Sequence, residues 1–247
     1  MTFLIIQART GSTRLPGKVL RNLNSSLDSI IDLMILRLVR QFDRRQIILA
    51  TTDLEQDDKL AEVARNHRIE IFRGSSLDVY SRYVAAAREF DAEIIVRLTG
   101  DCPLVDPEDI QNGIQMFERG DYDYVSNVIP FDESTFPEGS DFEIFTRYGL
   151  EGLSGESVSG HSIEHVTFGF WRANNGFRCG QLQAEFDMSD VRYTLDYEED
   201  LQVIRYLDAE IRRRKIKGTT KEIYEIFSQN PSLKLLNSKY SFGIGWE

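Results

Sequence analysis

Cationic side chains, glycines and hydroxyl side chains crowd a short stretch near the start of the chain. The stretch directly follows a short apolar run and holds Arg9, Thr10, Gly11, Ser12, Thr13, Arg14, Gly17 and Lys18. Glycines let a backbone turn its N–H groups toward an anion, and the arginines and lysine supply positive charge that no nearby acid neutralises. This combination is typical of a loop that binds a triphosphate.

The spacing within this stretch excludes one familiar phosphate-binding loop. A Walker A loop has four residues between its glycines and a Ser or Thr after its lysine. Here five residues separate Gly11 from Gly17, and Val19 follows Lys18. The remaining alternative is a strand-to-helix turn that happens to be basic. That alternative leaves unexplained three cations within ten residues of a chain whose net charge is −11.

Two aspartates that lie far apart in the sequence are candidates for a metal site. Asp101 follows the expected strand 93–98 in a tight turn, where a buried carboxylate is costly without a cation or hydrogen bonds. We therefore favour a metal ligand over a turn-stabilising residue at Asp101. Asp196 stays open on composition alone. With Glu199 three residues later it imitates a capping box, whereas its alternative role is a second carboxylate on the same Mg²⁺.

Two further groups in the turn after residue 98 have simpler structural interpretations. Asp106 precedes Pro107, which suits the first position of a helix, so Asp106 is most simply the N-cap of a helix that ends near Gly120. Cys102 has no evident neighbouring base, and small buried thiols are common. We therefore expect a structural cysteine rather than a nucleophile.

Strand-like and helix-like segments alternate along the chain, without a low-complexity linker or an internal repeat. This pattern predicts an α/β fold with a mostly parallel, doubly wound sheet. Strands are expected over 3–6, 46–51, 69–72 and 93–98, and helices over 57–66, from a Ser76 cap to about Phe90, and from 197 through 207 and beyond. Ligands bind such sheets at the carboxyl ends of the strands. The loops after Ile6, Thr51, Phe72 and Leu98 should therefore share one rim.

The character of the sequence changes after Gly120. Residues 127–190 mix Gly, Ser, acids and aromatics, and we expect them to form a substrate-side or dimerisation insertion within a single domain of residues 1–247. Asp141 and Glu143 fall on one face of a possible strand there, which polar-out alternation explains equally well. His165 can contact an anionic substrate or be a satisfied structural histidine.

Length and composition limit the broad class. A chain of 247 residues with 41% hydrophobic content suffices for a sizeable core. The first apolar run is too short for a secretory signal or a membrane span, so we expect a cytoplasmic protein. The acidic total charge, without a basic stripe, disfavours nucleic acid as a partner. Two isolated cysteines indicate reduced thiols.

The sequence resembles the cytidylyltransferases of the spore-coat-polysaccharide type, with CMP-KDO and acylneuraminate cytidylyltransferases as more distant relatives. The similarity covers nearly the whole chain and is most specific over 7–20 and 97–104. It implies a glycosyltransferase-A-like (Rossmann-like) sheet flanked by helices, with a small β-rich insertion. It also implies CTP as the nucleotide, a homodimer, and Mg²⁺ bound by Asp101 and Asp196.

The resemblance further implies a reaction in which a hydroxyl of an acidic sugar attacks the α-phosphate of CTP and pyrophosphate leaves. The catalytic residues it implies are Arg9, Arg14, Lys18 and Asp101. The implied CTP contacts are Ala8, Arg9, Gly11, Ser12, Arg14, Lys18, Arg73 and Thr99. The implied sugar contacts are Asp141, Glu143 and His165.

Three other functions share parts of this pattern. A sugar-phosphate nucleotidyltransferase that uses UTP or GTP would have the same phosphate loop and metal. A glycosyltransferase of the same fold has an Asp-x-Asp after its central strand, but here the pair Asp121 and Asp123 precedes an expected strand. A non-catalytic nucleotide-binding module would bind CTP without releasing pyrophosphate.

Overall fold

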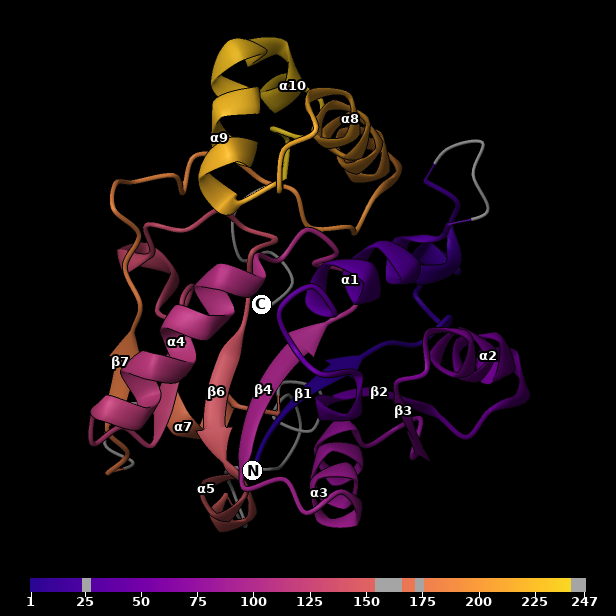
Figure 1. The fold of residues 1–247 in the computed structure, drawn as a ribbon, viewed down its shortest axis with the longest axis vertical. Helices are drawn as coiled ribbons and strands as arrows, with labels where there is room; N and C mark the ends of the chain where they lie inside the picture. Colours follow the sequence, from indigo (N-terminus) through magenta and orange to yellow (C-terminus); the bar gives the residue numbers. More distant parts are fainter. Residues whose placement is uncertain (24–27, 154–165, 172–175, 241–247) are drawn as a thin grey trace.

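A seven-stranded sheet forms the centre of the protein (Figure 1). The computed structural model describes residues 1–23, 28–153, 166–171 and 176–240. The strands are β1 (Thr2–Gln7), β2 (Ile47–Thr52), β3 (Glu70–Gly74), β4 (Ile94–Thr99), β5 (Tyr124–Ser126), β6 (Glu143–Thr146) and β7 (Cys179–Gln181). Their order is β3-β2-β1-β4-β6-β5-β7, and only β6 runs antiparallel to its neighbours. The expected α/β fold with a mostly parallel sheet is confirmed.

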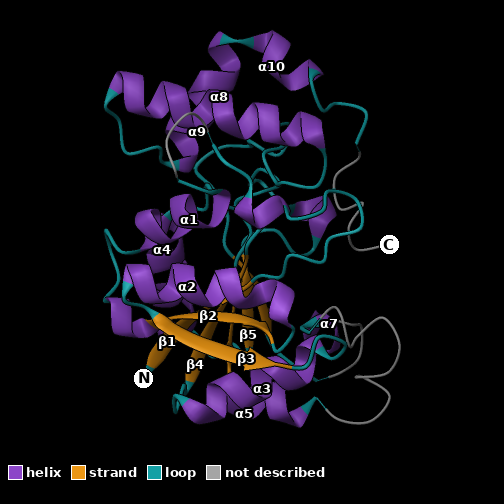
Figure 2. Cartoon of the chain, turned by 90° about the vertical axis from the view of Figure 1, so that its right-hand side faces the viewer, coloured by secondary structure: helices purple, strands orange, loops and turns teal. Residues whose placement is uncertain are grey.

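Helices cover both faces of the sheet and form a further layer beyond it (Figure 2). One face carries α1 (Ile30–Leu38), α2 (Asp58–His67) and α4 (Pro107–Arg119), and the other carries α3 (Val79–Glu89), α5 (Arg147–Gly152) and α7 (Phe168–Trp171). The further layer consists of α8 (Glu198–Arg214), α9 (Thr220–Gln229) and α10 (Pro231–Leu235). This last layer lies beyond the carboxyl ends of β1 and β4 (Figure 1).

The central strands are apolar on both faces because helices cover both sides of the sheet. Successive side chains of a strand point to opposite faces. In β1, Leu4 and Ile6 pack under α1 and α4, whereas Phe3 and Ile5 pack against α3. A continuous apolar run of this kind is therefore what a parallel strand in this position requires.

Helix starts follow the capping chemistry of Asp and Ser. Asp106 accepts a hydrogen bond from the backbone N–H of Glu108 (3.0 Å), so the predicted N-cap of α4 is confirmed. The prediction that Ser76 caps the next helix upstream is wrong. Asp78 caps α3 by accepting the N–H of Ser81 (2.8 Å), and its own N–H donates to Ser75 Oγ (3.0 Å) in the turn before the helix.

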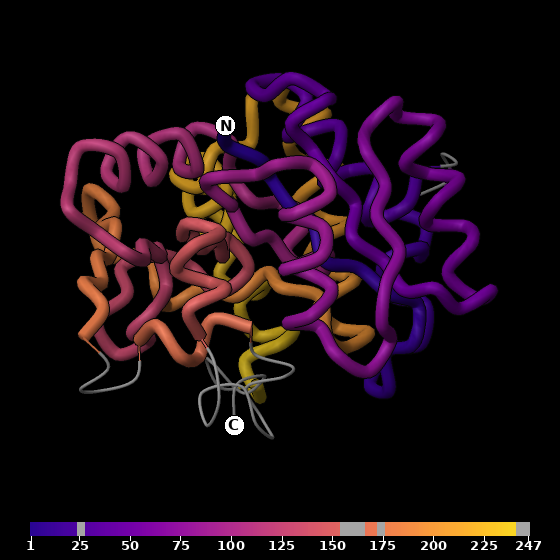
Figure 3. The backbone as a smooth tube through the Cα atoms, turned by 90° about the horizontal axis from the view of Figure 1, so that it is seen from below, coloured from indigo at the N-terminus to yellow at the C-terminus, as the bar shows by residue number. Residues whose placement is uncertain are grey.

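The described residues of 127–190 lie on the side of the sheet away from β3. Viewed from below in Figure 3, these described residues, coloured salmon and orange, and the purple segment around β3 occupy opposite sides. The strand β6 begins only at Glu143, so the prediction that Asp141 also lies on a strand is wrong. Asp141 belongs to a loop that passes close to the chain before α8. Gly139 (φ 108°) permits this approach, because a Cβ there would lie 2.4 Å from the Thr194 nitrogen.

A buried polar junction joins the outer helical layer to the sheet. Arg37 of α1 is 2% exposed and donates to the carbonyl oxygens of Leu104 (3.1 Å) and Gly218 (2.6 Å). At the start of α9, the N–H of Thr220 donates to Asp106 (3.0 Å) and its hydroxyl donates to Asp109 (2.6 Å). Hydrogen bonds therefore hold the turn after β4 between α1 and the start of α9.

This junction makes stability depend on pH through Asp109. Burial and then the neighbouring Asp106 raise the pKa of Asp109 to about 7. A carboxyl whose pKa is higher in the folded than in the unfolded state favours the fold at low pH, and this contribution is lost as pH rises from the ordinary value of 3.8 to about 7. Each pH unit in that interval costs at most about 1.4 kcal/mol.

We expect Asp109→Asn to make the decline in the free energy of unfolding between pH 5 and pH 7 shallower than in the wild type. Urea unfolding at each pH measures the decline. The exposed Asp132→Asn is the matched control and should keep the wild-type slope. An Asp109→Asn protein with the wild-type slope would contradict the assignment.

Candidate functional site

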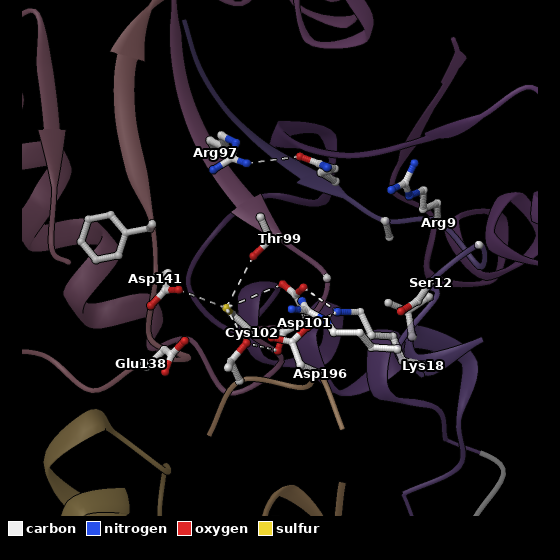
Figure 4. A pocket seen from close by; sticks show the side chains of 18 of the residues that line it. Arg9, Ser12, Lys18, Arg97, Thr99, Asp101, Cys102, Glu138, Asp141 and Asp196 are labelled. Carbon is white, nitrogen blue, oxygen red and sulfur yellow. Dashed lines mark hydrogen bonds and ion pairs between the residues drawn. The ribbon is translucent and has the colours of Figure 1, made fainter. Parts of the chain in front are cut away.

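A cavity of about 500 Å³ lies at the carboxyl ends of β1 and β4 (Figure 4). Four separate stretches of the chain line it: the basic loop after β1, the turn after β4, the segment 138–143 and the segment before α8. The polar side chains that line it include Gln7, Arg9, Arg14, Lys18, Arg97, Thr99, Asp101, Cys102, Glu138, Asp141, Glu143 and Asp196. Their common rim is the one at which ligands of open α/β sheets bind.

Apolar side chains hold the basic loop in place while its charged side chains face the cavity. Leu15 (6% exposed) packs in the core under the outer helical layer, and Val19 (2% exposed) packs in the core under α1. At the start of the loop, the N–H of Ala8 donates to the carbonyl of Ala50 (3.2 Å). These apolar and backbone contacts therefore hold the loop at several points, although its charged side chains favour water.

Asp57 anchors the same loop from the turn between β2 and α2. Its carboxylate is fully buried and accepts hydrogen bonds from the Thr10 N–H (2.8 Å) and the Thr10 hydroxyl (2.5 Å). Its second oxygen accepts the Thr52 hydroxyl at the end of β2. Asp57 thus ties the loop after β1 to the end of β2.

Lys18 occupies the centre of the site between two carboxylates. Its Nζ lies 2.7 Å from Asp101 Oδ2 and 3.0 Å from Asp196 Oδ1. Burial of the Lys18 side chain lowers its pKa, but the two carboxylates outweigh that effect and the pKa is raised. Burial would raise the pKa of Asp101, whereas the Lys18 ammonium lowers it to about 2. Lys18 and Asp101 are therefore both charged at neutral pH.

Asp196 accepts hydrogen bonds from two arginines in addition to Lys18. Arg14 Nη2 lies 2.6 Å from its Oδ1, and Arg192 Nη2 lies 3.2 Å from its Oδ2. The alternative that Asp196 caps the following helix is wrong. Asp200 takes that role by accepting the N–H groups of Asp196 and Tyr197, each at 2.9 Å.

The opposite wall of the cavity is acidic. Glu138 forms an ion pair with Arg192 (2.5 Å). Asp141 accepts the N–H of Gly139 (3.1 Å) and lies 3.7 Å from the Cys102 thiol. Burial, followed by the charges of Glu138 and Asp101, raises the pKa of Asp141 to about 7. This wall therefore presents carboxyl groups that can accept hydrogen bonds from a ligand.

Cys102 lies in the turn between the cationic and acidic walls. It is 1% exposed, and burial together with the charges of Asp141 and Asp101 raises the pKa of its thiol well above the ordinary value. A protonated, buried thiol is a poor nucleophile. The structural interpretation of Cys102 is therefore the one that the geometry favours.

Glu143 faces the cavity from β6, but its carboxylate has several partners within the protein. It forms a buried ion pair with Arg97, and it accepts the hydroxyls of Tyr124 (2.6 Å) and Thr167. Arg97 Nη2 also lies 3.4 Å from Gln7 Oε1. This network forms the wall farther from Lys18 (Figure 4).

The structure brings most of the expected site residues together. Those at the cavity are Ala8, Arg9, Gly11, Ser12, Arg14, Lys18, Thr99, Asp101, Asp141, Glu143 and Asp196. Arg73 is not among the residues that line it. Its guanidinium donates instead to the Thr52 carbonyl (2.9 Å) and the Leu54 carbonyl (2.8 Å). His165 lies outside the described residues.

Sequence reasoning missed Asp57, Glu138 and Arg192 as parts of the site. Asp57 was expected to start a helix, and its bonds to Thr10 depend on contacts across 47 residues. Arg192 and Glu138 lie in polar stretches of the sequence. The neighbouring residues there do not reveal whether a charged side chain forms a buried ion pair or lies at the surface. The Arg-Tyr-Thr-Leu-Asp stretch that begins at Arg192 was the one available signal.

The fold and the site together define a nucleotidyltransferase, and comparisons with known proteins agree. The sequence profile of the cytidylyltransferase family matches residues 3–216. The spore coat polysaccharide biosynthesis protein SpsF of Bacillus subtilis is 34% identical over 92% of this chain and 94% of its own length. This chain belongs to the cytidylyltransferase family and is a CTP-dependent nucleotidyltransferase.

Solved structures show the same fold. A cytidylyltransferase from Leptospira borgpetersenii is 30% identical, with a TM-score of 0.83, over 94% of this chain and 96% of that one. A CMP:2-keto-3-deoxy-manno-octonic acid synthetase solved with CTP has 17% identity and a TM-score of 0.61, over 85% of this chain and 98% of that one. The first likeness extends over nearly the whole of both chains.

We expect Asp57→Ala to weaken CTP binding about tenfold, because residues that orient a binding group typically contribute that much. It should also lower the free energy of unfolding by about 1–3 kcal/mol, since buried donors lose their acceptor. Calorimetric titration with CTP and urea unfolding measure the two effects. Asp53→Ala, an exposed change in the same loop, is the control. Wild-type CTP affinity in Asp57→Ala would show that the anchor does not matter for the nucleotide.

Proposed function

We propose that this protein transfers the cytidylyl group of CTP to a hydroxyl of a sugar and releases pyrophosphate. One observation carries the proposal. The cavity has a cationic wall and an acidic wall, and Lys18, Asp101 and Asp196 lie between them (Figure 4). A triphosphate needs the first wall, a polyhydroxylated acceptor suits the second, and phosphoryl chemistry takes place where the two substrates meet.

The basic loop is the proposed triphosphate site. Arg9, Arg14 and Lys18 supply charge, Gly11 and Ser12 let the backbone approach the phosphates, and Ala8 and Thr99 face the nucleoside. We assign no nucleotide contact to Arg73, because its guanidinium is bound to the loop after β2. Charge-assisted hydrogen bonds from Arg and Lys are the strong ones for phosphate oxygens.

The two carboxylates at the centre fit a divalent cation. Asp101 and Asp196 converge on the single Lys18 ammonium at 2.7 and 3.0 Å, so they can share one positive charge. Carboxylate oxygens are the ligands that Mg²⁺ prefers, and it commonly takes its others from phosphates and water. Within the described residues no third His, Cys, Asp or Glu joins them, so phosphates and water would complete the coordination. When bound, the ion would neutralise phosphate oxygens and the charge on the leaving pyrophosphate.

The protein's own groups then position the substrates and stabilise charge. The acceptor oxygen bonds to the α-phosphorus, the bond from that phosphorus to the bridging oxygen of pyrophosphate breaks, and the hydroxyl proton passes to water. Arg14 and Lys18 stay close to the departing phosphates and compensate the developing charge. Holding the acceptor in line with the leaving group supplies much of the remaining acceleration.

The acceptor class follows from the acidic wall and the relatives. Asp141 offers a carboxyl that can accept hydrogen bonds from sugar hydroxyls, and Glu143 lies farther along the same wall. SpsF is named for spore coat polysaccharide biosynthesis, and another relative of this fold makes a CMP-sugar acid. The acidic wall accounts for binding of the sugar hydroxyls, and from the relatives we infer an acidic sugar destined for a surface polysaccharide or glycan.

Assembly and location stay predictions. We expect a homodimer, which light scattering measures directly, and a cytoplasmic protein. Within the described ranges, no helix combines the length and apolar character needed to cross a membrane.

A turnover assay tests the proposed reaction. We expect pyrophosphate release from CTP and Mg²⁺ with at least one acceptor from a panel of sugar acids, sugar phosphates and polyol phosphates. UTP, GTP and ATP serve as competing nucleotides and should be poor substrates. Release from UTP or GTP in preference to CTP, or CTP binding without release from any acceptor, would contradict the proposal.

Asp101→Asn should lower turnover by on the order of 100-fold or more, because the site loses a charged ligand for the cation. The protein should stay folded, as judged by circular dichroism, since the amide keeps the shape of the side chain. Asp132→Asn, an exposed acid elsewhere on the chain, is the control and should keep wild-type turnover. Unchanged turnover in Asp101→Asn would remove Asp101 from the metal site.

A further inference from the structure

The segment that follows α10, residues 236–240, packs against the turn that carries Asp196. Asn237 is 2% exposed, and its side-chain amide donates to the Arg192 carbonyl (3.1 Å) and to Asp200 Oδ1 (2.9 Å). The Tyr240 hydroxyl donates to Glu199 Oε2 (3.1 Å), and Lys239 pairs with the other oxygen of Glu199 (2.7 Å). These contacts fix the segment beside the start of α8.

Tyr240 then stacks on Tyr197, which contacts Arg14 of the basic loop. The rings of Tyr240 and Tyr197 lie 3.7 Å apart between centroids with an interplanar angle of 3°. The guanidinium of Arg14 lies 5.5 Å from the centroid of the Tyr197 ring. This distance is within the range of a cation–π contact, which favours a guanidinium over a ring face.

Together with Asp196, these residues form a closed series of contacts. Arg14 contacts Tyr197, Tyr197 stacks on Tyr240, and Arg192 lies 5.8 Å from the centroid of the Tyr240 ring. The two arginines at the ends of this series each donate to a different oxygen of Asp196, at 2.6 and 3.2 Å. Displacing Tyr240 would therefore loosen Arg14 and Asp196 together.

Arg14 needs such support because its side chain is only partly enclosed. It is 38% exposed, and its ion pair with Asp196 must compete with CTP phosphates for the same guanidinium. A ring face holds a guanidinium without consuming its N–H donors. Tyr197 can thus keep Arg14 at the cavity while its donors turn from Asp196 to the nucleotide.

From this geometry we propose that Tyr240 is a positioning residue for CTP binding, acting through Tyr197 on Arg14, so that the segment 236–240 belongs to the nucleotide site. The inference rests on the proposed role of Arg14 at the phosphates. The profile of the cytidylyltransferase family matches only residues 3–216. The segment therefore lies beyond the residues that the family profile matches.

Calorimetric titration with CTP and Mg²⁺ tests the proposal without an identified acceptor. Tyr240→Ala should raise the Kd for CTP about fivefold, which is the size of a partly exposed cation–π contact. Tyr240→Phe should keep the wild-type Kd because the ring remains. Tyr240→Leu fills the space without a π face and should raise the Kd for CTP to the same extent. This variant keeps the test possible if Tyr240→Ala does not fold. Tyr148→Ala, an exposed tyrosine on α5, is the matched control.

A double-mutant cycle separates positioning from a general structural effect. Arg14→Gln alone should weaken CTP binding, and adding Tyr240→Leu to it should cause little further loss, because Tyr240 acts through Arg14. A full fivefold loss in the Arg14→Gln background, or wild-type Kd in Tyr240→Leu, would overturn the inference while leaving the proposed function intact. Failure of the wild-type protein to bind CTP would overturn both.

Discussion

The ammonium of Lys18, held between Asp101 and Asp196, is the interaction on which the rest of the site depends. The three groups come from positions far apart in the sequence and meet within 3.0 Å. Two carboxylates at this depth would repel one another and destabilise the fold if no cation lay between them. Lys18 therefore keeps this pair stable, and in the proposed mechanism the same two carboxylates would hold a divalent cation when the phosphates of CTP enter.

The architecture serves to bring these groups together from different layers. The parallel strands β1 and β4 end side by side, which places the basic loop next to the turn of Asp101. The outer helical layer then supplies Asp196 just before α8, and the buried Arg37 ties that layer to the turn after β4. The core of the protein thus determines the distance between the charges, while the loops provide the charges themselves.

Local signals predicted the strands and the central residues of the site. Apolar runs bounded by turn residues identified β1 and β4, and the unusual positive charge of the loop identified Lys18 as a phosphate-binding candidate. The prediction failed wherever a role depends on distant contacts. Asp57 looks like a helix start but accepts from Thr10, and Arg73 looks like a nucleotide ligand but binds its own neighbouring loop. Nothing in the sequence indicated a role for Tyr240 at the site, because only the folded chain places its ring on Tyr197.

A crystal structure of the protein with CTP and Mn²⁺, with the metal located by its anomalous scattering, tests the central claim most directly. The account predicts one strong anomalous peak in contact with carboxylate oxygens of both Asp101 and Asp196 and with phosphate oxygens of CTP, and Lys18 Nζ shifted onto a phosphate. A triphosphate bound away from the basic loop, or a metal that contacts neither aspartate while Lys18 stays between them, would contradict it.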